Sequence, residues 1–386
     1  MKFDFDERIS RRNTNSQKWD TAHGKDDVVP MWVADMDFKA ADPVIRAMEH
    51  KLAHGVFGYA YIPDAYYEAE MNWWEKRHHC PIEKDWIVFT PGVIPALAVV
   101  IQAFTSPGDK VLIQAPVYNA FYGVISANER EIVENELVSQ DGIYGIDFED
   151  FEKKAEDDRV KLFILCNPHN PVGRVWSKEE LERLAEICRK HNVLVIADEI
   201  HRDLVFGGST FIPFAAVDAM NSITCTSPSK TFNIAGLKTA NIVTANSELK
   251  DKIKHALHVN GLHDPNNFGV EALIAAYNEG EEWLDQLLVY LESNRDYFLA
   301  FVEEKLPRLK VSAPEATYLM WVDCRSLGIN SEELGRRLYE EAGLRINEGN
   351  MYGNAGDGFI RVNIGCTREV LTEGLERLEK ALGQLN

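Results

Sequence analysis

Cysteine is scarce in this sequence. Six residues, Cys80, Cys166, Cys188, Cys225, Cys324 and Cys366, are scattered over 386 positions without CxxC spacing. In a chain of this length the pattern is typical of reduced thiols packed in the interior, and it argues against a disulfide framework. We therefore expect a protein of a reducing compartment.

Long hydrophobic runs are also missing. No stretch approaches the roughly 18–20 consecutive apolar residues that a membrane-spanning helix needs. The first twenty residues carry mixed charges and contain no apolar segment of signal-peptide length. The sequence thus predicts a cytoplasmic protein with no membrane partner.

Basic side chains are outnumbered, with 41 Lys and Arg against 61 Asp and Glu, which gives a formal net charge of −20. Nucleic acids and anionic membranes both select surfaces with clustered Lys and Arg. The charge therefore argues against both classes of partner. It leaves open an anionic small ligand, because a local pocket can oppose the overall sign.

The composition that is present favours a folded α/β protein. Hydrophobic residues make up 45% of the chain, and at roughly 100–200 residues per domain the length suggests two domains. Short, nearly continuous apolar segments alternate with helical patterns at 95–105, 120–128, 178–191 and 248–258. Such alternation predicts a mainly parallel seven-stranded sheet sandwiched by helices. The expected strands are 86–90, 111–114, 131–138, 161–166, 193–198, 223–226 and 241–244.

The pattern changes after about residue 280. A long charged helical stretch at 281–305 leads to a strand, helix and strand at 318–323, 331–342 and 359–364, and to a final helix from Arg368. We predict a large domain over 46–280 and a smaller α/β domain built from both chain ends. The smaller domain would comprise residues 281–386 and be joined by the N-terminal segment 1–45.

Polar residues follow four of the expected strands. The segments are TPGVIPAL (90–97), CNPHNPVG (166–173), DEIH (198–201) and SPSKTFNIAGLK (227–238). Ligands of doubly wound sheets bind outside the carboxyl ends of the strands. The sequence therefore predicts one polar site at one edge of the sheet.

Asp198 and Lys230 indicate the chemistry of this site. An apolar strand delivers the Asp198 carboxylate to a position that is costly without a cationic partner. Lys230 stands among the hydroxyls of Ser227, Ser229 and Thr231. Taken singly, Asp198 would be a helix cap or a structural ion pair, and Lys230 a solvated charge. Together they suggest a pyridoxal phosphate site, in which a partly buried lysine forms a Schiff base.

A phosphate group at this site needs donors, and three sources are present. Ser227 and Ser229 offer hydroxyls, and Lys238 offers a charge. The backbone N–H groups of Val93 and Ile94 open a predicted helix, where the dipole favours an anion.

Histidines offer a weaker alternative, a metal site. His50 and His54 share a helix face, and His78 and His79 adjoin Cys80. Neither group has a second ligand pair at useful spacing, so we expect no metal.

Five segments carry a resemblance to a known family. MWVADMDF (31–38), FGYAY (57–61), NPHNPVGRVW (167–176), DEIHRDL (198–204) and SKTFNIAGLK (229–238) resemble the MalY/PatB branch of carbon–sulfur lyases. This branch belongs to the fold-type I, aspartate aminotransferase-like pyridoxal phosphate enzymes. The resemblance covers nearly the whole chain.

The resemblance implies roles at the cofactor. Lys230 would hold the cofactor covalently and then move protons, and Asp198 would keep the pyridinium nitrogen protonated. Asn170 would hydrogen-bond the phenolic oxygen of the ring, with His201 nearby, and Tyr118 would stack on the ring face. Lys238 stands where the wider superfamily usually has arginine, which loses the bidentate fork but keeps the charge.

The resemblance also implies a substrate site and a partner. Arg361, with Asn170, would bind the α-carboxylate of an amino-acid substrate. Tyr59 would reach the phosphate from the neighbouring subunit of a homodimer with shared active sites.

The implied reaction is β-elimination from cystathionine or a related cysteine conjugate, giving a thiol, pyruvate and ammonia. The alternative is an aminotransferase that uses the same Lys230, Asp198 and Arg361. A third hypothesis is a non-catalytic regulatory protein of the same fold.

Overall fold

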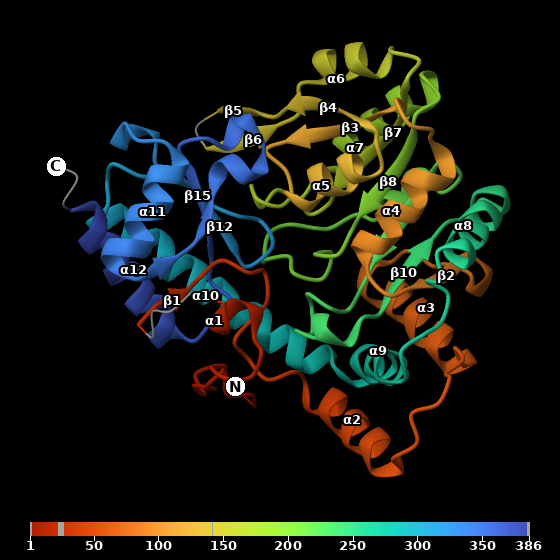
Figure 1. Ribbon diagram of the computed structural model, residues 1–386, viewed down its shortest axis with the longest axis horizontal. Coiled ribbons are helices and arrows are strands. Elements are labelled where there is room, and N and C mark those ends of the chain that lie inside the picture. The colour runs from red at the N-terminus through yellow and green to blue at the C-terminus, as the bar shows by residue number, and fades with distance from the viewer. Residues whose placement is uncertain (1, 22–26, 141, 384–386) are drawn as a thin grey trace.

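A seven-stranded sheet forms the centre of the larger part of the molecule (Figure 1). The computed structural model describes residues 2–21, 27–140 and 142–383. The strand order is β2-β10-β9-β8-β7-β3-β4. Strand β10 runs opposite to the other six strands of this sheet, so the predicted mainly parallel sheet is confirmed. The strands are β2 (Ile87–Thr90), β3 (Lys110–Ala115), β4 (Glu131–Glu136), β7 (Val160–Cys166), β8 (Leu194–Asp198), β9 (Ser222–Thr226) and β10 (Ala240–Val243).

Helices cover both faces of this sheet because its central strands are apolar on both sides. Along β7, Ile164 packs in the cluster formed with α4 and α8, whereas Phe163 and Leu165 pack in the cluster formed with α6 and α7. This alternation follows from the two-residue period of a strand. The covering helices are α4 (Val93–Phe104), α5 (Ala120–Ala127), α6 (Phe148–Ala155), α7 (Lys178–Lys190) and α8 (Ser247–Val259).

The local signals explain where these helices begin. Ser177 caps α7 and forms a reciprocal capping box with Glu180. Helix α4 begins at Val93, two residues before the predicted start, with Gly92 at the N-cap. Pro95 therefore occupies the third helical position, where its missing N–H removes no bond within the helix.

One predicted strand was wrong in extent. The expected strand 131–138 ends at Glu136, and Val138–Gln140 forms a separate strand, β5, that pairs with β6 (Ile143–Gly145) in a hairpin. Leu137 is buried between the two strands, and its N–H donates to the carbonyl of Ala115. An apolar residue at the junction thus made two strands look like one.

A second, smaller sheet lies beside the large one, at the left of Figure 1. Its order is β11-β12-β15-β14, with all pairs antiparallel. Strand β1 (Val29–Pro30) pairs with β13 (Leu344–Arg345), so both chain ends meet here, as predicted. The fold class is confirmed, and the domain boundaries stay a prediction. The elements are β11 (Lys310–Ser312), β12 (Leu319–Asp323), β14 (Asn347–Glu348), β15 (Phe359–Asn363), α10 (Glu281–Lys305), α11 (Ser331–Ala342) and α12 (Arg368–Leu382).

The remaining α-helices lie in the lower half of Figure 1, with α2 at its lower edge. They are α1 (Gln17–Asp20), α2 (Asp42–His54), α3 (Asp64–His78) and α9 (Asn267–Glu279). In the described ranges no helix combines the length and the apolar character that a bilayer crossing requires. All six cysteines are buried, and none is bonded to another.

The segment 31–38 joins the two sheets. The side chain of Asn363, at the end of β15, donates to the carbonyls of Val33 and Asp35. The side chain of Asn233, from the large domain, donates to the carbonyls of Met36 and Phe38. Both parts of the molecule therefore hold this segment, and it lies over the carboxyl ends of the large sheet.

Candidate active site

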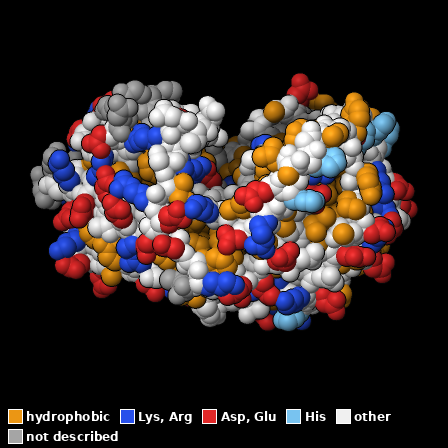
Figure 2. Space-filling view, turned by 90° about the horizontal axis from the view of Figure 1, so that it is seen from below, with side chains coloured by type: hydrophobic (Ala, Val, Ile, Leu, Met, Phe, Trp, Pro, Cys, Tyr) orange, Lys and Arg blue, Asp and Glu red, His pale blue; other side chains and the backbone are white. Residues whose placement is uncertain are grey.

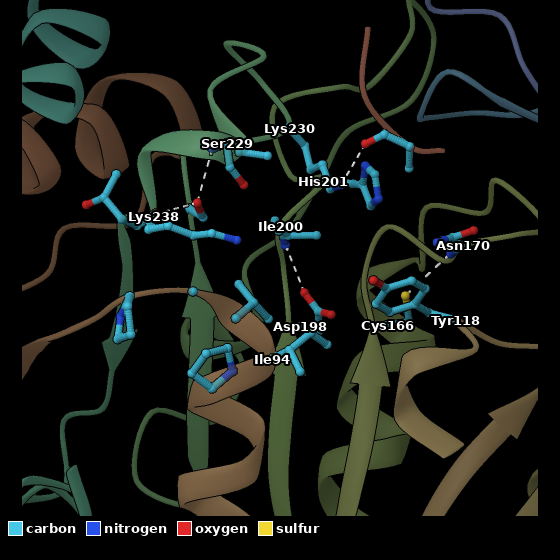
Figure 3. A pocket seen from close by; sticks show the side chains of 18 residues that line it. Ile94, Tyr118, Cys166, Asn170, Asp198, Ile200, His201, Ser229, Lys230 and Lys238 are labelled. Atoms are coloured by element: carbon cyan, nitrogen blue, oxygen red, sulfur yellow. Dashed lines mark hydrogen bonds between the residues drawn. The ribbon is translucent and has the colours of Figure 1, made fainter. Parts of the chain in front are cut away.

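A cavity of about 350 Å³ lies at the carboxyl ends of the central strands (Figure 3). The four polar segments that follow β2, β7, β8 and β9 all contribute to its wall. The structure thus brings ten of the predicted site residues together. They are Val93, Ile94, Tyr118, Asn170, Asp198, His201, Ser227, Ser229, Lys230 and Lys238.

Lys230 presents its amine to this cavity from the turn that follows β9. Its Nζ donates to the carbonyl oxygen of Ala34 at 2.6 Å. Burial, with the nearby charge of Arg361, lowers the pKa of the Lys230 amine to about 8. A substantial fraction of this amine is therefore neutral near physiological pH, as a nucleophile or a base must be.

Asp198 ends strand β8 and faces the same cavity (Figure 3). The backbone N–H of Ile200 donates to its carboxylate at 3.2 Å, and no residue in the described ranges forms an ion pair with it. Burial raises the pKa of Asp198 to about 7. A cation placed in the cavity would offset this cost of burial.

The expected phosphate donors lie on the side of the cavity near Lys238. The side chain of Lys238 extends into the cavity (Figure 3), and the first N–H groups of α4, at Val93 and Ile94, have no acceptor within the helix. The Ser227 hydroxyl, in contrast, donates to the carbonyl of Thr239 at 2.7 Å. Its proton is therefore engaged, which leaves Ser229 as the better hydroxyl donor.

Tyr118 and Asn170 lie across the cavity from Lys238 (Figure 3). His201 is buried, and its Nδ1 has no hydrogen-bond partner within the described part of the chain. Burial, together with the charges of Lys230 and Arg361, lowers the pKa of His201 to about 3. The imidazole is therefore neutral at physiological pH.

Arg361 reaches the site from β15 of the smaller sheet. Its Nη1 donates to Asn170 Oδ1 at 3.2 Å, and its Nη2 donates to Asn347 Oδ1 and to the carbonyl of Trp32. The Nε atom is buried and has no acceptor among the residues that the structure describes. The residue thus joins the two sheets and contacts the cavity wall through Asn170, although Arg361 is not itself one of the residues that line the cavity.

Tyr59 lies outside this cavity in the single chain. Its side chain is fully exposed, and Leu52, Val56, Phe57 and Tyr61 are exposed beside it in the sequence. Figure 2 shows hydrophobic side chains gathered on the right-hand lobe of the lower face. An exposed apolar segment of this kind is typical of a protein interface.

The candidate metal ligands have structural contacts. His78 Nε2 lies 2.8 Å from an oxygen of Asp203, and His78 packs against Phe211. Within the described ranges no three potential ligands are grouped in a way that could hold a metal.

Sequence reasoning missed several residues at the cavity. Ala34 accepts hydrogen bonds from Lys230 and, at 3.0 Å, from the hydroxyl of Tyr318. Cys166 and Thr239 line the wall. The sequence marks the segment 31–38 only through its resemblance to the family, because a backbone carbonyl gives no signal in a sequence.

The donor set fits pyridoxal phosphate. The buried Asp198 carboxylate forms no ion pair with any described residue, as expected for a residue that faces a protonated ring nitrogen. The Lys230 amine, whose pKa is lowered, fits the carbonyl group of the cofactor. Lys238 and the start of α4 fit its phosphate. Arg361, whose Nε has no acceptor among the described residues, fits the carboxylate of a substrate. The groups needed to hold the cofactor and an amino acid therefore meet in one place.

The chain is similar to known proteins along nearly its whole length. The model of the family "aminotransferase class I and II" matches residues 26–378. The chain is 44% identical to the cystathionine beta-lyase PatB of Bacillus subtilis (strain 168), over 98% of this chain and 99% of PatB. It is 36% identical to the protein MalY of Escherichia coli (strain K12), over 98% and 99% of the two chains. A pyridoxal phosphate-bound structure described as a putative aminotransferase, from Clostridium difficile 630, superposes with a TM-score of 0.96 at 43% identity, covering 100% of both chains.

Proposed function

The chain belongs to the aminotransferase class I and II family, and we propose that it is a pyridoxal phosphate-dependent carbon–sulfur β-lyase of the MalY/PatB branch. Its substrates would be cystathionine or related cysteine conjugates, cleaved to a thiol, pyruvate and ammonia. The observation that carries the proposal is the placement of the Lys230 amine and the Asp198 carboxylate in one buried cavity.

The residues that would hold the cofactor are those that line this cavity. Lys230 would bind its carbonyl carbon and Asp198 its ring nitrogen, with Tyr118 against the ring. Asn170 and His201 would lie near the phenolic oxygen. Val93, Ile94, Ser229 and Lys238 would surround the phosphate, with Ser227 supporting this wall through its bond to Thr239.

When bound, pyridoxal phosphate supplies an electron sink that accepts the electron pair left at the substrate Cα. Arg361 and Asn170 would orient the substrate through its α-carboxylate, because guanidinium and carboxylate groups form strong charge-assisted bonds. The Nζ of Lys230 would then take the Cα proton. Its pKa of about 8 suits this task, since a base works best near the operating pH.

Expulsion of the thiolate from Cβ completes the cleavage of the carbon–sulfur bond. Hydrolysis of the remaining three-carbon unit gives pyruvate and ammonia. The buried position of Asp198 favours the early step, because a carboxylate in an apolar environment interacts strongly with a cationic ring.

We further propose a homodimer in which Tyr59 enters the neighbouring subunit's site. The exposed apolar residues at 52–61 support this interface. We also propose a cytoplasmic location, which the six buried, unpaired cysteines support.

An aminotransferase is the second candidate function, favoured by the likeness to the Clostridium difficile structure described as a putative aminotransferase. Both reactions begin with removal of the Cα proton, so Lys230, Asp198 and Arg361 would serve either one. The substrate decides between them, because elimination requires a leaving group at Cβ.

A product assay separates the two functions. We expect the purified protein, incubated with cystathionine and no keto acid, to release free thiol and pyruvate in equal amounts. Pyruvate that forms only while an added keto acid is consumed would reject the lyase. The variant Lys230→Ala should lose both the activity and the absorbance of the lysine-bound cofactor, and retention of either would reject the proposed site.

A further inference from the structure

A second buried carboxylate, Asp203, lies five residues after Asp198. Its Oδ2 accepts a hydrogen bond from the hydroxyl of Thr231 at 2.8 Å. Its Oδ1 accepts from the indole Nε1 of Trp73 at 2.9 Å and lies 2.8 Å from Nε2 of His78. Asp203 does not line the cavity, and the roles proposed above leave it unused.

Thr231 is the immediate neighbour of Lys230. Lys230 points into the cavity, whereas the buried Thr231 hydroxyl points to Asp203. Asn233, two residues further on, is bonded to the carbonyls of Met36 and Phe38. The turn that carries Lys230 is therefore tied on one side to the segment 31–38 and on the other side to Asp203.

Asp203 itself is held firmly. Burial alone would raise the pKa of Asp203, but the contact with His78 and the charge of Arg202 outweigh burial and hold that pKa below its usual range. The next residue, Leu204, donates its N–H to the carbonyl of His201 at 2.9 Å. A charged acceptor is thus fixed between helix α3 and the turn that carries His201.

The neighbouring Arg202 also holds the segment that carries Asp203 against helix α3. Its Nη2 donates to Glu70 of α3 at 3.2 Å, and its guanidinium lies over the ring of Trp74. Glu70 also accepts hydrogen bonds from Thr226 and Asn241, at the ends of β9 and β10. Asp203 therefore belongs to a buried layer that connects α3 to the strand ends beneath the cavity.

We propose that Asp203 is a positioning residue for Lys230, acting through the hydroxyl of Thr231. A lysine has a long flexible stem, so its amine occupies a defined position only if its backbone is fixed. The bond between Asp203 and Thr231 supplies this constraint beside the reacting amine. The inference rests on the proposed function, in which Lys230 holds the cofactor and moves the proton.

The test compares three variants of the cofactor-loaded protein. Thr231→Val keeps the shape of the side chain and removes the donor, and Thr231→Ser restores the donor. Thr244→Val is the matched control, because the Thr244 hydroxyl is also buried and donates to the carbonyl of Ser222 at 2.9 Å. Thr244 follows β10 at the opposite end of the sheet from Lys230.

Two measurements distinguish positioning from mere stability. For Thr231→Val we expect kcat for cystathionine to fall on the order of tenfold with little change in KM. We also expect the midpoint pH of the absorbance change of the lysine-bound cofactor to shift by about half a unit or more. Thr231→Ser should behave like the parent protein, and Thr244→Val should lose stability without changing kcat or the midpoint.

The proposal would be overturned if Thr231→Val and the parent protein had the same kcat and the same midpoint pH. It would also be overturned if Thr231→Ser failed to restore the parent values. If Thr231→Val does not fold, Thr231→Ala carries the same expectations. The absorbance midpoint requires no lyase turnover. A parent protein that releases no pyruvate would therefore reject the proposed function, and the absorbance midpoint would still decide the role of Asp203.

Discussion

Replacement of Asp198 by asparagine should stabilise the protein once its cofactor is removed. Asp198 is 3% exposed, and its carboxylate accepts a hydrogen bond from the backbone N–H of Ile200. Burial raises its pKa from 3.8 to about 7. Asparagine has the same size, accepts the same bond and carries no charge.

The sign of the pH dependence follows from proton linkage. The folded state holds the Asp198 proton more tightly than the unfolded state, so stability is lost as the pH rises from about 4 through 7. A rise in pKa from 3.8 to about 7 corresponds to about 4 kcal/mol, at about 1.4 kcal/mol for each tenfold change in acidity. The free energy of unfolding of Asp198→Asn should therefore exceed that of the parent by about 2 kcal/mol at pH 5 and by about 4 kcal/mol at pH 8.

Urea unfolding of the cofactor-free parent and variant, at pH 5 and pH 8, measures this difference. The same pair of proteins, loaded with cofactor, should show the opposite order of lyase activity, because asparagine offers no charge to the ring nitrogen. An advantage that is the same at both pH values, or a variant less stable than the parent at pH 8, would refute the reasoning. The result would show that the site is built at the expense of stability.

Two further predictions concern Arg361 and Glu199. Arg361→Lys keeps the charge but cannot donate to Asn170, Asn347 and the carbonyl of Trp32 together. KM for cystathionine should therefore rise roughly tenfold to a hundredfold, as expected for a lost charge-assisted bond. An unchanged KM in steady-state assays would show that Arg361 does not bind the substrate. Burial raises the pKa of Glu199 to about 8, and its Oε2 has no hydrogen-bond partner in the described ranges. The parent should therefore lose stability as the pH rises from about 4.5 to 8. Glu199→Gln should weaken that loss by a few kcal/mol in urea unfolding, and an identical pH dependence in both proteins would contradict it.

The sheet and most of the site could be predicted because their signals are local. An apolar segment followed by polar residues, as at 193–198, predicts both a strand and the end of the strand where ligands bind. Convergence of the four polar segments then follows from parallel topology, in which carboxyl ends share an edge. Lys230, Asp198 and Lys238 meet for this reason.

The rest of the site depends on contacts between residues far apart in the sequence. The bond from Lys230 to Ala34 spans 196 positions, and the bond from Arg361 to Trp32 spans 329. No periodicity or spacing encodes such contacts. The direction of the Ser227 hydroxyl and the bond between Thr231 and Asp203 likewise depend on packing that only the folded chain defines.

The hydrogen bonds that hold the segment 31–38 affect when, during synthesis, the protein can complete its cofactor site. Asn363 holds Val33 and Asp35 across 330 and 328 positions. At a synthesis rate of about 5–20 residues per second, the segment waits tens of seconds for its partner to be made. The central sheet can form before residue 363 has been made, but the bonds from Asn363 to the segment that contacts Lys230 cannot. A nascent chain should therefore acquire its cofactor site only after its last strand, β15, has been released.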